Sequence, residues 1–145
     1  MKRRRIICVG NPFVPGDEIG PAVFERLSRL PLPDGVDLID GGIRGLDLLP
    51  LVEGADRVVF VDTLSGFGAP GEPIAEDAEV FARDLDSAYG HCDGLGFLLR
   101  ALPAAASGPL PEIVVAGTTS GASGDSLDRL AVMALEIADL KRGAR

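Results

Sequence analysis

Three side chains that can bind a metal ion lie at ends of predicted structural elements. Asp17, Asp62 and His91, the only histidine in the chain, each occur where a predicted β-strand gives way to a loop or a helix. Open α/β sheets gather functional groups at such positions. Two carboxylates and an imidazole suit nickel, zinc, manganese or iron better than a metal that prefers thiolates. Three protein ligands would also leave coordination positions open for water or a substrate group.

Each of these residues also has an ordinary structural explanation. Asp17 precedes a helix-like stretch, and an aspartate at a helix start commonly only caps the helix. An aspartate after a strand, as at Asp62, is a common turn former. A lone histidine such as His91 is more often a satisfied surface or core residue than a ligand. Spacing alone therefore leaves both explanations open.

The segments that must position these residues alternate between strand-like and helix-like patterns. This alternation predicts an α/β fold with three layers, in which a mostly parallel, twisted sheet of about five strands carries helices on both faces. Strands are predicted near residues 5–10, 36–39, 57–62 and 112–116, and helices near 18–30, 44–53, 91–102 and 125–141. Asp125 or Ser126 is available to cap the last helix.

Residues 66–90 do not fit this alternation. Pro70, Gly71 and Pro73 are followed by acidic residues with weak periodicity. We expect an edge strand and a mobile loop in this region. No internal repeat or interdomain linker is recognisable in the rest of the chain, and 145 residues with 46% hydrophobic content suit one ordinary domain. A single domain over residues 1–145 is therefore expected.

Composition narrows the classes of function and location. A net charge of −8 argues against binding to nucleic acid, which needs a basic surface. The basic cluster at residues 2–5 abuts the first strand, so we expect a solvated start to that strand instead of a binding arm. No apolar run approaches the roughly 20 residues of a membrane span. Cys8 and Cys92 make a poor disulfide framework, and no signal peptide is recognisable, so a cytoplasmic protein is expected.

Four motifs follow one another in a specific order along nearly the whole chain. They are Gly10-Asn11-Pro12 with Gly16-Asp17 and Ile19-Gly20-Pro21; Asp40-Gly41-Gly42-Ile43-Arg44-Gly45-Leu46 with Leu48-Leu49; Val61-Asp62 before a loop with glycine and proline; and His91 before Gly94-Leu95. This order resembles the hydrogenase maturation endopeptidases. These cytoplasmic proteins trim the carboxyl terminus of the [NiFe]-hydrogenase large-subunit precursor.

The resemblance implies a specific set of metal-contacting residues. In that family an acidic residue after the Gly-Asn motif, an aspartate after the third strand and a histidine hold a metal, and these correspond to Asp17, Asp62 and His91. The family often has two adjacent acids followed by glycine, whereas this chain has Gly16-Asp17-Glu18. Counting from the asparagine selects Asp17, and a shift of one residue would select Glu18.

The resemblance also implies an unusual peptidase. The chain lacks the His-Glu-x-x-His helix that holds a resident zinc. Family members instead recognise nickel already inserted in the precursor, so nickel is expected to arrive with the substrate, with cadmium or zinc as surrogates. Gly41, Gly42 and Gly45 would bind substrate by letting its backbone approach closely, or would serve only a tight turn. The expected partner is the large-subunit precursor, and the expected state is a monomer.

Three other functions compete with this one. The first is a cysteine or serine hydrolase. Cys92 beside His91 would make a poor nucleophile and base pair, because adjacent helical residues do not face each other, and a Gly-x-Ser-x-Gly elbow is absent. The second is a nucleotide-binding module. The glycines after the first strand lack the spacing of a dinucleotide-binding motif, and residues 117–124 lack the lysine of a P-loop. The third alternative is a catalytically inactive family member that senses nickel and binds the precursor without shortening it.

Overall fold

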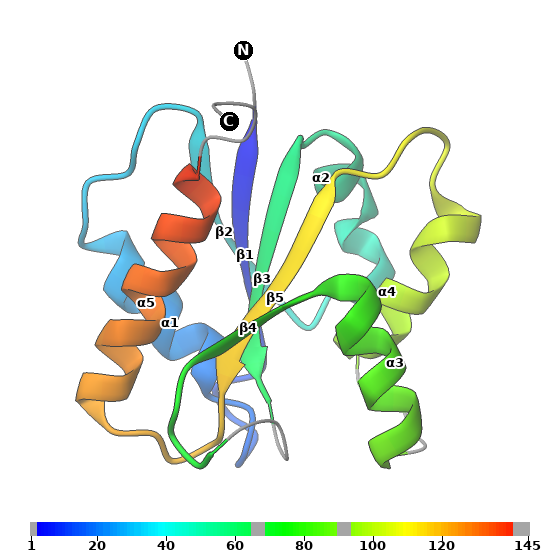
Figure 1. The fold of residues 1–145 in the computed structure, drawn as a ribbon. Helices are drawn as coiled ribbons and strands as arrows, with labels where there is room; N and C mark the ends of the chain where they lie inside the picture. Colours follow the sequence, from blue (N-terminus) through cyan, green and yellow to red (C-terminus); the bar gives the residue numbers. More distant parts are fainter. Residues whose placement is uncertain (1–2, 65–68, 90–93, 141–145) are drawn as a thin grey trace.

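A computed structural model describes residues 3–64, 69–89 and 94–140 (Figure 1). The strands span Arg4–Val9 (β1), Val36–Gly42 (β2), Arg57–Thr63 (β3), Ile74–Asp77 (β4) and Glu112–Thr118 (β5). They form one sheet of five strands in the order β2-β1-β3-β5-β4. The first, second, third and fifth strands run parallel, and β4 pairs antiparallel with β5 at one edge.

The middle of the sheet is dry because β3 has neighbours on both edges and helices over both faces. Residues 57–62 of β3 are all buried. Val58 to Val61 form a continuous apolar run, which is typical of a strand covered on both faces. The register carries this core across the sheet, since Phe60 pairs with Ile7 on one side and with Val115 on the other.

Helices cover the sheet in two layers (Figure 1). Helices α1 (Ile19–Ser28) and α5 (Gly124–Asp139) lie together on one face. The other face carries the 3-10 helix η1 (Gly45–Leu48), α2 (Leu49–Glu53), α3 (Ala78–Tyr89) and α4 (Gly94–Ala105). Alternate residues of β1 serve the two cores: Ile6 and Cys8 pack towards α1 and α5, whereas Ile7 and Val9 pack towards the other helices. The predicted three-layer α/β fold is confirmed.

Two local predictions need correction. The edge strand expected within residues 66–90 is confirmed as β4, but it leads directly into α3, a helix that the sequence pattern does not predict. The last helix begins at Gly124 with Ser123 as its N-cap, so neither Asp125 nor Ser126 caps it. The Ser123 side chain accepts a hydrogen bond from the backbone N–H of Ser126, which satisfies a free donor of the first turn.

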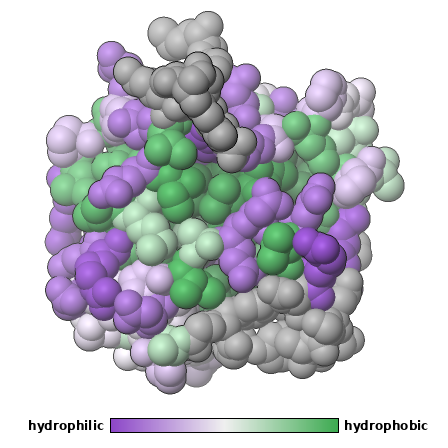
Figure 2. Space-filling model, in the orientation of Figure 1, coloured by the Kyte–Doolittle hydropathy of each residue, from purple (hydrophilic) through white to green (hydrophobic). Residues whose placement is uncertain are grey.

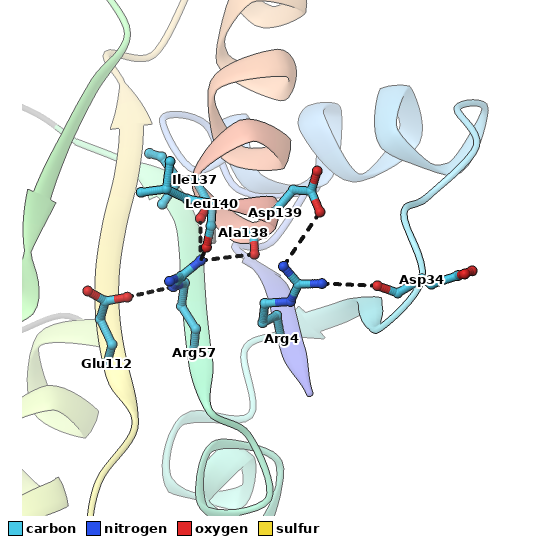
Figure 3. A network of polar contacts seen from close by, with 8 residues as sticks. All are labelled: Arg4, Asp34, Arg57, Glu112, Ile137, Ala138, Asp139 and Leu140. Atoms are coloured by element: carbon cyan, nitrogen blue, oxygen red, sulfur yellow. Dashed lines mark hydrogen bonds and ion pairs between the residues drawn. The ribbon is translucent and has the colours of Figure 1, made fainter. Parts of the chain in front are cut away.

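At the amino-terminal edge of the sheet, a buried arginine ties β3 to the end of α5 (Figure 3). Arg57 is 6% exposed, and its Nε lies 2.5 Å from a carboxylate oxygen of Glu112 on β5. Its Nη1 donates to the carbonyls of Ile137 at 3.0 Å, Ala138 at 3.2 Å and Leu140. A cation here stabilises the carbonyls at the carboxyl end of the helix, where few backbone donors are available and the helix dipole is negative.

The basic start of the chain belongs to the same edge. Arg4 forms an ion pair with Asp139 at 3.5 Å and donates to the carbonyl of Asp34 at 3.0 Å (Figure 3). Arg5 is 8% exposed and donates to the carbonyl of Leu51 at 2.7 Å. The expectation of a solvated start is therefore wrong for these two arginines, because both join β1 to neighbouring elements.

Figure 2 shows hydrophobic residues gathered in the middle of the face that carries the β4 edge, with hydrophilic residues around them.

Within the ranges that the structure describes, no helix is long and apolar enough to cross a membrane.

Candidate functional site

A pocket of about 250 Å³ lies at the carboxyl ends of the central strands. Figure 1 shows these strand ends at the lower edge of the sheet. Its walls come from the ends of β1 and β3, the loop between β1 and α1, the turn after β2, and α4. The lining residues are Val9, Gly10, Asp17, Gly42, Ile43, Gly45, Leu48, Asp62, Leu95 and Leu98. The parallel topology produces this convergence, because the carboxyl ends of neighbouring parallel strands open on the same edge.

Asp17 is held by the loop that it helps to build. Its Oδ2 accepts a hydrogen bond of 2.7 Å from the backbone N–H of Asn11. Gly10 starts this loop with a φ of 139°, and a Cβ at Gly10 would lie 2.6 Å from the carbonyl oxygen of Asp17. Only glycine fits that conformation and that approach. The Gly-Asn motif therefore places the Asp17 carboxylate at the pocket wall.

Asp62 enters the pocket from the end of β3. It is 5% exposed, and its Oδ1 accepts a hydrogen bond of 2.8 Å from the backbone N–H of Thr63. The Thr63 hydroxyl in turn accepts a hydrogen bond of 3.1 Å from the N–H of Ile19, the first residue of α1. This contact ties the end of β3 to the start of the helix that follows Asp17. Asp17, in the loop after β1, and Asp62, at the end of the neighbouring strand β3, thus line one pocket.

Glu18, the alternative acidic ligand, faces a different part of the molecule. Its carboxylate accepts hydrogen bonds from the Ser120 hydroxyl at 2.8 Å and from the N–H of Gly121 at 2.8 Å, both in the loop between β5 and α5. The Gly121 N–H is the largest cause that lowers the pKa of Glu18 below its usual value. Glu18 does not line the pocket.

The three glycines of the second motif have different surroundings. Gly42 and Gly45 line the pocket with φ values of 54° and 56°, and a Cβ at either would meet no atom within 4 Å. Their bare backbone therefore borders open space. Gly41 is buried, and a Cβ there would lie 2.8 Å from Ile7 Cγ2 and 2.9 Å from Val9 Cγ1. Packing against β1 accounts for Gly41, which does not line the pocket.

The third predicted metal-contacting residue, His91, lies outside the described residues, as does Cys92. The part of the chain that the structure describes contains no group of three or more histidine, cysteine or acidic side chains placed to hold a metal ion. The two carboxylates suit a divalent cation in donor type.

Burial raises the pKa of the Cys8 thiol well above its usual range, so Cys8 is a packing residue and not a nucleophile.

Sequence reasoning did not identify the apolar walls of the pocket. The apolar lining residues beside the carboxylates are Val9, Leu48, Leu95, Leu98 and the exposed Ile43. Leu48 and Leu95 belong to the sequence motifs, but no motif assigns them or Leu98 to a pocket wall. Their place in the pocket depends on how η1 and α4 pack beneath the ends of β1 and β3, which spacing along the chain does not reveal.

Comparison with known proteins decides the family. The model of the hydrogenase maturation protease family matches residues 21–120, a range that includes Asp62 and begins after Asp17. The chain belongs to this family. The resemblance found in the sequence motifs is confirmed.

Individual members of the family show the same relationship. Hydrogenase 2 maturation protease of Escherichia coli is 35% identical over 100 residues, which cover 67% of this chain and 61% of that protein. The hydrogenase expression/formation protein HoxM of Azotobacter vinelandii is 36% identical over 77 residues, 52% of this chain and 37% of that protein. The chain thus spans less than two thirds of the length of these relatives.

Solved structures extend the likeness over nearly the whole fold. The hydrogenase maturating endopeptidase HybD from E. coli superposes with a TM-score of 0.70 at 25% identity, covering 93% of this chain and 88% of that one. The [NiFe] hydrogenase maturation protease HycI from Thermococcus kodakarensis has a TM-score of 0.61 at 22% identity, covering 96% and 94%. The second likeness shows the fold alone.

Proposed function

We propose that this protein is a peptidase that removes the carboxyl-terminal extension of a [NiFe]-hydrogenase large-subunit precursor after nickel has been inserted. Family membership supports the reaction class. The observation that carries the proposal is the convergence of the Asp17 and Asp62 carboxylates on one pocket at the carboxyl edge of the sheet. In this proposal nickel is part of the substrate, and a cytoplasmic monomer meets the precursor.

The two carboxylates have the chemistry to recognise a precursor-bound nickel ion. Asp62 is 5% exposed, and its Oδ1 already accepts a backbone hydrogen bond, so its orientation is fixed before any substrate arrives. Two negatively charged oxygen donors in a partly dry pocket favour a dication over a neutral group. We assign His91 as the third contact, which would complete the ligand set without filling the coordination sphere of the metal.

This arrangement would make nickel a maturation check. A precursor without nickel would bring no positive charge to compensate the two carboxylates, and burying them against a neutral protein surface is costly. Discrimination would therefore come from the penalty against the nickel-free precursor as much as from attraction to the loaded one. The open glycine backbone at Gly42 and Gly45 would let the precursor chain lie close to the pocket.

Processing of nickel-loaded and nickel-free precursor by the purified protein tests this proposal. Mass spectrometry is expected to show loss of a carboxyl-terminal peptide only from the nickel-loaded precursor. Asp62→Asn and Asp17→Asn keep the shape of the side chains and remove the charge, and each should lower kcat/KM at least a hundredfold. Glu18→Gln is the matched control, because Glu18 faces Ser120 and Gly121, and it should retain activity.

Three outcomes would count against parts of the proposal. Binding of the precursor without any mass change would favour the nickel-sensing module over the peptidase. Equal processing of nickel-free precursor would remove the maturation check. Full activity in Asp17→Asn with loss in Glu18→Gln would move the acidic contact by one residue.

A further inference from the structure

Exposed apolar side chains stand on two segments that also contribute residues to the pocket wall, the first through Gly10 and Asp17 and the second through Gly42, Ile43 and Gly45. Phe13 is 91% exposed and Val14 is 47% exposed on the loop between β1 and α1. Ile43 is 75% exposed and Leu46 is 38% exposed on the segment that follows β2. We call these four residues the apolar rim. Of the four, Ile43 lines the pocket itself, so the rim reaches the site that contains Asp17 and Asp62 at this residue.

The loop that carries Phe13 is organised by hydrogen bonds and by the pocket carboxylate. The N–H of Phe13 donates to Asn11 Oδ1 at 2.9 Å, and the N–H of Val14 donates to the Asn11 carbonyl at 3.1 Å. The N–H of Asn11 donates to Asp17 Oδ2 at 2.7 Å. Phe13 is therefore held outward by a built turn, and its exposure leaves a large apolar area in water that a bound partner would bury.

The segment that carries Ile43 is fixed in a similar way. Arg44 donates from its side chain to the carbonyl of Gly41 at 3.2 Å and to that of Asp40 at 2.5 Å. The N–H of Gly10 donates to the carbonyl of Gly42 at 2.9 Å, so the roots of the two loops are joined. The apolar rim thus sits on a frame that is already formed, which lowers the entropic cost of binding.

A second copy of this chain fits the rim less well. Four side chains offer much less area than the roughly 800 Å² per partner of a standard stable interface, so the rim alone does not support a dimer. Two copies of a chain with a net charge of −8 would also repel each other. A substrate that binds in the pocket is already next to the rim, so it reaches the rim without any further contact surface.

Resting on the proposed function, we propose that the apolar rim docks an apolar segment of the precursor polypeptide next to its nickel site. The carboxylates would test for the metal, and burial of Phe13 and Ile43 would supply most of the affinity for the polypeptide. Charged contacts mainly give specificity, whereas buried aromatic and aliphatic anchors dominate binding energy. The open backbone at Gly42 and Gly45, which lines the pocket on either side of Ile43 in the sequence, would let this segment lie close to the site.

Steady-state processing of nickel-loaded large-subunit precursor by rim variants tests the inference. Phe13→Ser and Ile43→Ser should each raise KM at least tenfold and change kcat less than threefold. Calorimetric binding of nickel ion to the protein alone should be the same in both variants as in the wild type, because neither side chain contributes a metal donor. That comparison also verifies that the pocket has stayed folded.

Two control variants remove apolar side chains elsewhere. Val132→Ser changes a residue of α5 that is 48% exposed and should leave KM unchanged. Leu110→Ser changes a residue that is 38% exposed and lines a second pocket of about 480 Å³, formed with α3 and α4. An increase in KM for Leu110→Ser with none for the rim variants would place docking at that second pocket and overturn the inference.

The outcomes separate this inference from the function on which it rests. If the wild-type protein processes the precursor and both rim variants keep its KM, the apolar rim has no docking role while the proposed function stands. If the wild-type protein neither binds nor processes any nickel-loaded large-subunit precursor of its own organism, the proposed function fails, and the inference fails with it.

Discussion

Two adjacent acids at the start of α1 illustrate how single residues divide their work. Asp17 faces the pocket, whereas Glu18 links α1 to the loop before α5. The backbone N–H of Gly121 in that loop donates to the Glu18 carboxylate, stabilises its ionised form and is the largest cause of its lowered pKa. One acid is therefore available for recognition of a ligand, and its neighbour joins two segments of the fold.

The lowered pKa of Glu18 gives a prediction about stability against pH. A carboxylate with a lower pKa in the folded state contributes stability that is fully present above its unfolded-state pKa, near 4.5, and that is lost as pH falls through the folded-state value. Glu18→Gln should therefore lower the free energy of unfolding by about 1 kcal/mol at pH 7, with a smaller difference in acid.

Urea unfolding of the wild type and Glu18→Gln between pH 3 and pH 7 measures this difference. Glu136→Gln, at an exposed position of α5, gives the background effect of losing one carboxylate. A Glu18→Gln effect that stays constant with pH, or that grows in acid, would contradict the assigned contact.

At the scale of elements, the carboxyl end of α5 depends on a side chain from another element. Arg57, which is 6% exposed, donates to three carbonyls at the end of that helix and pairs with Glu112 (Figure 3). Removing a buried cation takes a donor from these carbonyls and a counter-charge from Glu112, which typically costs more than the intact contacts contribute. Arg57→Met should therefore destabilise the fold by about 3 kcal/mol.

Thermal and denaturant unfolding of Arg57→Met check this value. Arg29→Met is the matched control, because Arg29 pairs with Glu25 on the surface, where the two side chains are 73% and 63% exposed. Its effect should stay below about 1 kcal/mol. Similar losses in the two variants would mean that the Arg57 contacts do not hold α5 as described.

The elements that the sequence predicted correctly are those with a clear local signal. The run from Val58 to Val61 and the glycines after β1 indicate a buried strand and a sharp turn through residue type alone. Helix α3 was missed because Pro70, Gly71 and Pro73 are typical of a loop. The spacing of Ala78, Phe81 and Ala82 nevertheless has helical period. Ser123 was missed as a cap because the glycine that follows it is typical of a loop and not of a first helical turn.

The site divides in the same way. Asp17, Asp62, Gly42 and Gly45 were selected from the motifs, and the structure brings all four to one pocket. The apolar walls at Leu48, Leu95 and Leu98 were not predicted, because their neighbours are distant in the chain. Contacts between distant segments depend on the order of the strands, and no local pattern states that order.

At the scale of the whole molecule, burial is unevenly distributed across the sheet. β1 and β3 are covered on both faces and paired on both edges, whereas β4 pairs only with β5 and alternates between half-buried and exposed residues. Local opening follows low burial and solvent-exposed backbone hydrogen bonds. The free energy of opening should therefore fall from the centre of the sheet to the β4 edge.

Native-state hydrogen exchange tests this gradient. The amides of Ile7, Cys8, Val59 and Phe60 should exchange only through global unfolding, and their rates should follow the denaturant dependence of the whole fold. The amides of β4 should exchange at least a hundredfold faster and with little denaturant dependence, because opening an edge strand exposes little surface. Equal protection of β4 and β3 would mean that the sheet opens as one unit. In that case low burial at the β4 edge would not lower the free energy of local opening, and the edge strand would share the stability of the centre of the sheet.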